Sequence, residues 1–350
     1  MKILKLCGNT AKRVTTTVGP EQEYFIIDKE MYLKRSDLMF TGRTLFGAKP
    51  PKGQELDDHY FGTIRQRVAG FMKNINEELW KVGVTSKTQH NEVAPAQHEI
   101  APIYANANVA VDQNQVVMQT LKRIACQHDM KCLLHEKPFA GVNGSGKHNN
   151  WSLVTDTGEN LLEPGDTPHE NKQFLLVLAA IIKAVDKYAG LLRESAADPG
   201  NDHRLGANEA PPAIISVFLG SQLEDIINQY IETGSALTSI EGGFLTTGSA
   251  ALKDITKDAT DRNRTSPFAF TGNKFEFRGV GSSQTIGTVN TMLNTILASQ
   301  MREMSDLISS GKNVMEVIRD FVINHKRIIF SGDGYSSEWE LEAAVRGLSN

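Results

Sequence analysis

The sequence has little of several features that define common protein classes. Only three cysteines occur in 350 residues, Cys7, Cys126 and Cys132, and their spacing fits neither a disulfide framework nor a zinc site. We expect them to be buried free thiols, which are typical of a reducing compartment, and therefore expect a cytoplasmic protein. No uninterrupted apolar run reaches about 18 residues, and the charged start of the chain does not resemble a signal peptide. We therefore expect no association with a membrane.

An excess of positive charge is also missing. The 37 lysines and arginines are outnumbered by 41 aspartates and glutamates, which gives a formal net charge of -4. Without a basic stripe, nucleic-acid binding has little support. Internal repeats and low-complexity linkers are absent too, so nothing marks a second domain boundary. With 40% hydrophobic and 22% charged residues, the composition is ordinary for a globular protein, and we predict one domain over residues 1–350.

Hydrophobic patterns predict strands and helices that follow each other without a regular βαβ rhythm. Strands are predicted over 14–28, 133–139, 151–156, 211–220 and 274–283. Helices are predicted over 60–82, 109–130, 172–192, 221–234, 285–309, 314–325 and 339–347. The first strand is expected to be entered through a turn at Gly19 and Pro20, and residues 36–58 to form a long loop. Because several strands alternate apolar and charged residues, we predict an α+β fold with an antiparallel sheet.

A glycine-rich segment, GVNGSGKHNNWSL, covers residues 141–153 and carries one of only nine histidines, His148. The segment is expected to be too flexible to bury much. Two interpretations compete for it. The glycines could cradle a phosphate group, or they could hold His148 open as a ligand for a metal ion.

Pairs of carboxylates occur at strand spacing. Glu21 and Glu23 are two residues apart in GPEQEYF, which places them on one face of a strand, roughly 6.5 to 7 Å apart. Like charges at this distance raise a pKa unless a cation lies between them. The alternative interpretation is a solvated edge, since most exposed charge pairs have no function.

Further acidic residues lie in apolar surroundings. Glu92 and Glu99 flank a proline in HNEVAPAQHEIAP, where valine, alanine and isoleucine would not solvate them, so a partner or a metal ion is needed. We interpret the neighbouring His90 and His98 as surface or supporting groups rather than ligands. In KFEFR, Glu276 shares a strand face with an arginine while two phenylalanines point the other way.

Together these residues make five carboxylates and one imidazole. That set is sufficient for two divalent cations, and its oxygen-rich chemistry suits Mg²⁺ or Mn²⁺ better than zinc. Arginines accompany them, namely Arg204, Arg262 and Arg264. Metal ions and arginines that face one cavity are typical of phosphoryl transfer, although Arg262 could equally be a solvated surface residue.

At this point the sequence resembles a known family. VGPEQEYF, NEVAPAQHEIAP, NGSGKHNNW, RLGANEAPP, RNR and KFEFR occur in this order in glutamine synthetases, and the wording is similar to the type III branch. The resemblance implies a curved antiparallel sheet that bears the active site and is flanked by helices. It also implies that ATP phosphorylates the side-chain carboxylate of glutamate, after which ammonia displaces phosphate to give glutamine.

The resemblance assigns roles to individual residues. One metal ion would be held by Glu23, Glu92 and Glu99, and the other, on the nucleotide side, by Glu21, His148 and Glu276. Glutamate would contact Asn143, Gly144, Arg204 and Arg278, and ATP would contact Asn150, Ser152 and Lys274. Arg264 would stabilise the transferred phosphoryl group. Glu209 would shield the acyl phosphate as part of a flap and take a proton from ammonium.

The sequence departs from the family pattern in places. The spacing from Glu92 to Glu99 is one residue shorter than in type I enzymes, position 269 is alanine rather than arginine, and Lys274 replaces another arginine. Type III enzymes are also about twice as long. The β-grasp domain expected before Val14 has only thirteen residues in its place, and the family continues past residue 350.

The difference in length leaves alternatives open. We expect a catalytic domain without the β-grasp domain and the C-terminal extension. It would be a glutamate–ammonia ligase and a homo-oligomer, and the resemblance implies ring assembly for the full-length members of the family. A γ-glutamyl ligase that uses another amine is one alternative, and a fragment that binds nucleotide and metal without turnover is the other.

Overall fold

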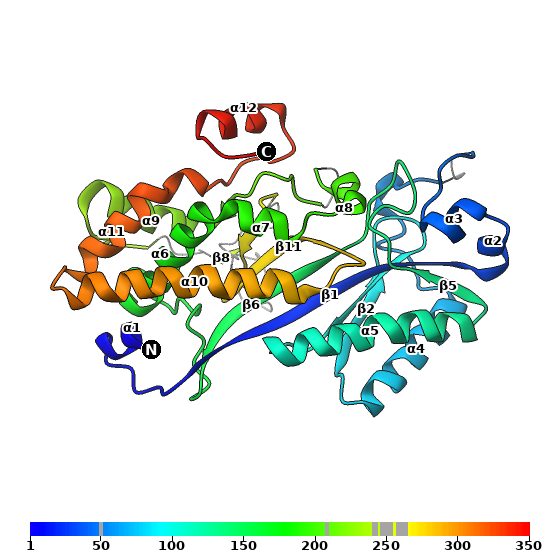
Figure 1. Ribbon diagram of the computed structural model, residues 1–350, viewed down its shortest axis with the longest axis horizontal. Helices are drawn as coiled ribbons and strands as arrows, with labels where there is room; N and C mark the ends of the chain where they lie inside the picture. The colour runs from blue at the N-terminus through cyan, green and yellow to red at the C-terminus, as the bar shows by residue number, and fades with distance from the viewer. Residues whose placement is uncertain (49–51, 207–209, 240–243, 246–254, 257–264) are drawn as a thin grey trace.

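In the computed structural model, an open sheet with helices packed on it organises the chain (Figure 1). The structure describes residues 1–48, 52–206, 210–239, 244–245, 255–256 and 265–350. Within these residues, nine strands form the sheet in the order β2-β3-β1-β6-β11-β10-β7, and β4 and β5 also pair with β1. All of these pairings are antiparallel except the parallel pair β7 and β10. The predicted α+β class is confirmed.

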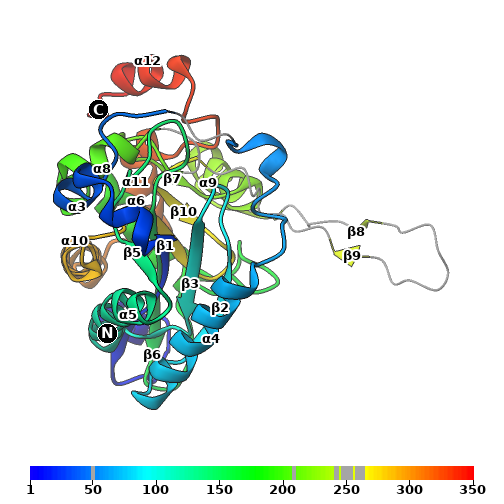
Figure 2. The ribbon, with the colours of Figure 1, turned by 90° about the vertical axis from the view of Figure 1, so that its right-hand side faces the viewer.

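The strands of the sheet differ greatly in length. Their bounds are β1 (Val14–Asp28), β2 (Ser86–Asn91), β3 (Gln97–Pro102), β4 (Ala105–Asn106), β5 (Met130–Leu133), β6 (Gly146–Thr155), β7 (Val217–Phe218), β10 (Phe268–Phe270) and β11 (Phe275–Gly281). Strand β1 continues through Gly19 and Pro20, so the turn expected there is absent. Pro20 lies opposite Asn149 in the pairing with β6. A separate two-stranded sheet, β8 (Phe244–Leu245) and β9 (Ile255–Thr256), projects from the body (Figure 2).

Each of the seven predicted helices is present, but the first begins at Gln66 rather than at residue 60, and the one predicted over 172–192 is divided in two. The short helices over 2–6, 29–33, 36–41 and 199–204 were not predicted. The bounds of the helices are α1 (Lys2–Leu6), α2 (Lys29–Leu33), α3 (Ser36–Thr41), η1 (Glu55–Asp57), α4 (Gln66–Lys81), α5 (Ala107–Gln127), α6 (Lys172–Lys187), α7 (Ala189–Ser195), α8 (Pro199–Arg204), α9 (Ser221–Thr233), α10 (Ile286–Ser309), α11 (Val314–His325), η2 (Lys326–Ile328) and α12 (Ser337–Val345). None of the described helices is both long and apolar enough to cross a membrane.

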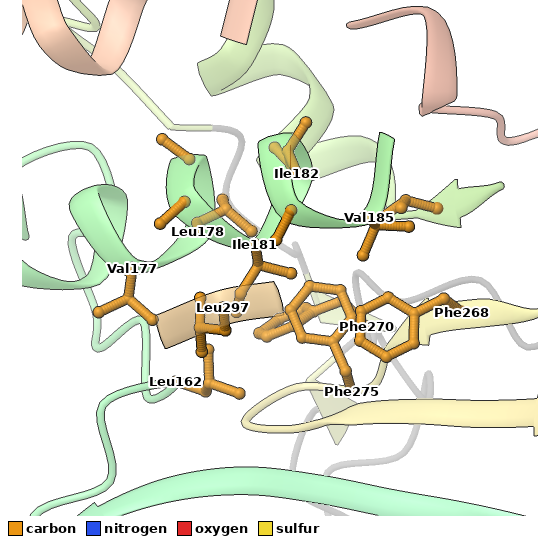
Figure 3. Packing of buried hydrophobic residues seen from close by; sticks show 14 of the residues in the cluster. Leu162, Val177, Leu178, Ile181, Ile182, Val185, Phe268, Phe270, Phe275 and Leu297 are labelled. Atoms are coloured by element: carbon orange, nitrogen blue, oxygen red, sulfur yellow. The ribbon is translucent and has the colours of Figure 1, made fainter. Parts of the chain in front are cut away.

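The hydrophobic core lies between one face of the sheet and the long helices. Helix α6 presents Ile181 and Val185 to phenylalanines of β10 and β11, whereas its Val177 lies toward Leu162 and Leu297 (Figure 3). At the other end of the sheet, α4 and α5 pack on Tyr24 and Ile100 and form a second apolar cluster. Because side chains alternate along a strand, this packing turns the intervening residues toward the opposite face.

Further expectations about local structure were wrong. Of the strand predicted over 133–139, only Leu133 lies in a strand, at the end of β5. Of the cysteines expected to be buried, only Cys132 is buried, and Cys7 and Cys126 are exposed.

The glycine-rich segment is not an open loop, because β6 begins at Gly146 between β1 and β11, and Lys147 and Asn149 are fully buried on its core side. Only Val217–Phe218 of the strand predicted over 211–220 pairs. At its start Pro211 and Pro212 cannot donate hydrogen bonds, and at its end Gly220 has a φ of 82°, which lies outside the strand region. The expected loop at 36–58 contains α3 and η1.

Candidate active site

A first group of ionisable side chains crosses the middle of the sheet, on the face that points away from α6 and α10. Glu21 on β1 lies directly opposite His148 on β6, and Glu276 extends from the next strand, β11. The Nδ1 atom of His148 is 3.0 Å from Oε2 of Glu21 and 2.9 Å from Oε1 of Glu276. Three neighbouring strands thus bring together one imidazole and two carboxylates, with potential ligand atoms within 4.8 Å of one another.

A second group lies on the same face, toward the edge strand β2. His90 is opposite Glu99 of β3, and its Nε2 atom lies 3.1 Å from Oε1 of Glu92 and 3.8 Å from Oε1 of Glu99. Both carboxylates are buried. Potential ligand atoms of these three residues also lie within 4.8 Å of one another. His90, which sequence reasoning placed among surface or supporting groups, therefore lies within a cluster capable of holding a metal ion.

Glu23 lies between the two groups. It is opposite Glu99 in the pairing of β1 with β3, and its Oε2 atom accepts a 2.6 Å hydrogen bond from the backbone N–H of Gly146. Burial raises the pKa of Glu23, and the nearby carboxylate of Glu92 adds to this, while the charge of Arg204 opposes it. The structure thus places all six predicted metal ligands on one sheet face, with Glu23 bound to a backbone amide.

The electrostatics of this face favour a bound cation. Burial raises the pKa of Glu99 to about 9, and the charges of Glu21, Glu23 and Glu92 act in the same direction. Burial acts to lower the pKa of His148, but Glu276 and Glu21 outweigh it and hold the pKa well above its ordinary value. Crowded carboxylates of this kind need a positive partner.

The residues fit divalent metal ions. The Nε2 atom of His148 is buried and has no hydrogen-bond partner among the described residues. Carboxylate oxygens with a single imidazole are ligands that Mg²⁺ and Mn²⁺ accept. When bound, such ions would neutralise phosphate charge.

A cavity of about 530 Å³ adjoins the first group. Glu21 lines it together with Asn150, Ser152 and Lys274, the three residues predicted to contact ATP. Asn150 donates a 2.7 Å hydrogen bond from Nδ2 to Oε1 of Glu21, which links the cavity to the carboxylate cluster. Lys87 and Tyr104, which the sequence did not single out, also belong to its lining.

The segment predicted to contact glutamate is fixed from several sides. Asn143 is buried, donates its backbone N–H to Oε1 of Gln54 at 2.5 Å, and accepts from Nε2 of the same residue at 2.8 Å. The carbonyl of Gly144 accepts a 2.8 Å hydrogen bond from Nε2 of Gln97. Neither Gln54 nor Gln97 was predicted, because a glutamine in a loop or strand carries no signal without its partner.

Arg204 lies against this segment. Its guanidinium is buried, and its Nη2 atom lies 3.3 Å from the backbone carbonyl oxygen of Arg278. Arg278 follows Glu276 by two residues on β11. Burial lowers the pKa of Arg204, while the charge of Glu23 opposes the shift. A Cβ atom on Gly146 would overlap the guanidinium, which explains glycine at that position.

Glu136 is a buried acid that sequence reasoning missed. Its backbone carbonyl accepts from the N–H of Ser145 at 2.7 Å, and its Oε1 atom accepts from the N–H of Ser283 at 2.8 Å. It therefore joins the segment predicted to bind glutamate to the end of β11. Glu136 lies between His135 and Lys137 in the sequence, and these polar neighbours gave no reason to expect that it is buried.

The predicted catalytic residues Glu209 and Arg264, and also Arg262, lie outside the described residues. Their predicted roles therefore stay predictions.

Buried His98 predicts a specific pH dependence of stability. Burial lowers the pKa of His98 to about 3, with the charges of His59 and His90 acting in the same direction. An unfolded histidine has a pKa near 6.5, so between these values only the unfolded chain binds the proton. The free energy of unfolding should therefore fall as the pH drops below about 6.5, by up to about 1.4 kcal/mol per pH unit.

Urea unfolding at pH 7 and pH 5.5 tests this. We expect His98→Gln to lose about 1 kcal/mol less than the wild type over this interval, whatever its stability at pH 7. His203→Gln, at an exposed position, should keep the wild-type dependence. Equal pH dependence in His98→Gln and the wild type would contradict the assignment.

Comparison with known proteins agrees with this geometry. The family model described as glutamine synthetase, catalytic domain, matches residues 5–197, and the model of the glutamine synthetase C-terminal domain matches residues 313–350. The chain is 53% identical to the type-3 glutamine synthetase of Dictyostelium discoideum, over 97% of this chain and 47% of that protein. It is 51% identical to the glutamine synthetase of Butyrivibrio fibrisolvens, over 100% of this chain and 51% of that protein.

Solved structures give a likeness in fold. Plasmodium falciparum glutamine synthetase superposes with a TM-score of 0.57 at 16% identity, over 86% of this chain and 55% of that one. The structure of GmaS without ligand superposes with a TM-score of 0.54 at 18% identity, over 99% of this chain and 70% of that one. The chain spans about half the length of the curated relatives it matches. With a catalytic-domain model that covers more than half of its residues, the chain belongs to the glutamine synthetase family.

Proposed function

We propose that this chain joins ammonia to the side-chain carboxylate of glutamate at the expense of ATP, giving glutamine, ADP and phosphate. The observation that carries the proposal is the arrangement on one sheet face. Two groups of carboxylates and histidines lie on this face, and Glu21 of the first group lines a cavity of about 530 Å³ together with Asn150, Ser152 and Lys274. Family membership supports the same reaction.

Two divalent cations, Mg²⁺ or Mn²⁺, are proposed for the two groups. Glu21, His148 and Glu276 would hold the ion on the nucleotide side, since Glu21 also lines the cavity. Glu92 and Glu99 would hold the other ion, with Glu23 as their third ligand. His90, 3.1 Å from Glu92, is an additional candidate ligand that the geometry supports.

The chemistry follows from charge and position. An oxygen of the glutamate side chain attacks the γ-phosphorus of ATP, and ADP leaves. Ammonia then attacks the acyl carbon, and phosphate leaves with the carboxylate oxygen. Lys274, on the cavity wall, would bind the nucleotide phosphates, and Asn150 and Ser152 would contact the nucleotide. Because the reacting groups are anionic, catalysis depends mainly on positioning and charge neutralisation.

Glutamate would lie beside the segment that Gln54 and Gln97 fix. We propose Asn143 and the carbonyl of Gly144 for its amino group, and Arg204 and Arg278 for its carboxylates. The buried guanidinium of Arg204 supports this, because its long contacts with carbonyl oxygens leave it able to bind an anion. Arg264 is proposed to stabilise the phosphoryl group in transfer, and Glu209 to shield the acyl phosphate and deprotonate ammonium.

We further propose that the protein acts in the cytoplasm as a homo-oligomer, in line with its family, and that residues 1–350 form a catalytic domain. The chain matches several proteins that are named glutamine synthetases, and each match covers about half of that protein's length.

An assay of the purified chain tests the reaction. With Mg²⁺ and ATP, phosphate release should require glutamate and ammonium together, and ¹⁵N-ammonium should appear in glutamine by mass spectrometry. Methylamine in place of ammonium should give a much slower release. Faster release with methylamine would favour a ligase for another amine. ATP hydrolysis that is indifferent to glutamate, or metal-dependent ATP binding without turnover, would contradict the ligase function.

A further inference from the structure

Glu21 is the most exposed of the five carboxylates proposed as metal ligands. Its side chain is 29% exposed, whereas the other four residues are buried. Glu21 also lines the cavity of about 530 Å³ on the nucleotide side. A glutamate at the edge of an open cavity can adopt several rotamers, and holding it in one of them costs conformational entropy. A further contact that fixes this side chain would therefore strengthen the metal site.

Asn150 supplies such a contact. It lies two residues after His148 on β6, on the same strand face, and directly opposite Gly19 of β1. Its Nδ2 atom donates to Oε1 of Glu21 at 2.7 Å and to the backbone carbonyl oxygen of Gly19 at 3.1 Å. Both acceptors belong to β1, so Asn150 fixes the Glu21 carboxylate relative to the backbone that carries it.

The orientation of the Asn150 amide follows from its partners. A backbone carbonyl oxygen and a carboxylate can only accept hydrogen bonds, so the amide atom that meets both must be the nitrogen. Both N–H groups of Asn150 are then in use, and Oδ1 is the polar atom left for the nucleotide. Because this oxygen can only accept, Asn150 would meet a hydroxyl or amino group of the nucleotide rather than its phosphates.

The other oxygen of Glu21, Oε2, lies 3.0 Å from Nδ1 of His148. Both residues are proposed ligands, so this direct contact would have to open when a cation lies between them. Asn150 is not a proposed ligand, and its hydrogen bond to Oε1 can persist in the loaded site. Partners of this kind orient the ligands of a metal ion, and their loss typically costs about 10- to 100-fold in metal affinity.

We propose that Asn150 is a positioning residue for the cation on the nucleotide side, because it holds Glu21 in the orientation that binds the ion. This inference rests on the proposed function, which places a divalent cation at Glu21, His148 and Glu276. It gives Asn150 a role that precedes its contact with the nucleotide, so the effect should be measurable with the metal ion alone.

Titration with Mn²⁺, without nucleotide or glutamate, tests the proposal through the electron paramagnetic resonance signal of the free ion. The site that Glu276→Gln weakens is the one on the nucleotide side. Asn150→Leu keeps the shape of the side chain but cannot donate, and it should weaken Mn²⁺ binding at that site about tenfold. Asn150→Ala should lose as much. Tyr104→Phe removes a hydroxyl from another residue of the same cavity and should change the affinity less than about twofold.

The second group, which contains Glu92 and Glu99, is an internal control. Its Mn²⁺ affinity should not change in Asn150→Leu, whereas a general effect on the fold would weaken both sites. The inference is overturned if both sites weaken alike, or if Asn150→Leu and Asn150→Ala bind Mn²⁺ as the wild type does. A wild type that binds no Mn²⁺ would overturn it together with the proposed metal site. Mn²⁺ binding that depends on Asn150, in a chain that forms no glutamine, would support the inference and contradict the ligase function alone.

Discussion

Glu276→Gln is expected to weaken the binding of Mg²⁺–ATP by about a hundredfold or more while the protein stays folded. The carboxylate of Glu276 is buried and lies 2.9 Å from Nδ1 of His148. Glutamine keeps its shape but removes the charge that a divalent cation requires. The fold should survive because Phe275 and Phe277, on either side, remain in the core.

Calorimetric titration with Mg²⁺–ATP measures this effect. Glu340→Gln, which removes an exposed carboxylate on α12, is the matched control and should bind as the wild type does. Circular dichroism and urea unfolding should show that Glu276→Gln is folded at the titration temperature. An unchanged affinity in the folded variant would remove Glu276 from the proposed metal site.

Gly144→Ala is expected to destabilise the protein by about 3 kcal/mol and to abolish glutamate-dependent phosphate release. The added Cβ would overlap the backbone carbonyl oxygen of Glu136 and lie 2.8 Å from Cγ of Arg204. That carbonyl cannot move freely, because it accepts the N–H of Ser145. The new methyl group would therefore displace both the segment proposed to bind glutamate and the arginine beside it.

Urea unfolding and the phosphate-release assay check this prediction. Gly190→Ala is a matched control, since an added Cβ there would meet nothing within 4 Å and the position lies in helix α7. Alanine is favoured over glycine within a helix, so this variant should be at least as stable as the wild type. If Gly144→Ala unfolds at the wild-type urea concentration, the close packing around Gly144 is not a constraint.

Much of the fold was predictable from local patterns. The long amphipathic segments that became α4, α5, α10 and α11 show their apolar spacing directly. Alternation in KFEFR predicted that Phe275 and Phe277 face the core and Glu276 the other side, and the structure has them so. The predictions were wrong where contacts with neighbouring strands determine the local structure. Gly146 lies in a glycine-rich sequence typical of a loop, but it begins strand β6, which pairs with β1 and β11.

Prediction of the site was partial for a similar reason. Glu92 and Glu99 could be predicted because their neighbours in the sequence are apolar, and a buried carboxylate needs a partner in any fold. Nothing in the sequence distinguished His90 from His98, although their side chains lie on opposite faces of the sheet. His90 reaches two carboxylates, whereas His98 contacts the ring of Tyr24.

The sequence by itself determined the class of fold, the family resemblance and the set of acidic residues. Short segments are sufficient to show that apolar and charged residues alternate along a strand, and that an acidic residue has only apolar neighbours. The tertiary structure alone decided the register that sets Glu21 opposite His148 and Glu23 opposite Glu99. Register depends on contacts between strands that are far apart in the chain, and a slip of one residue would turn these side chains to the other face.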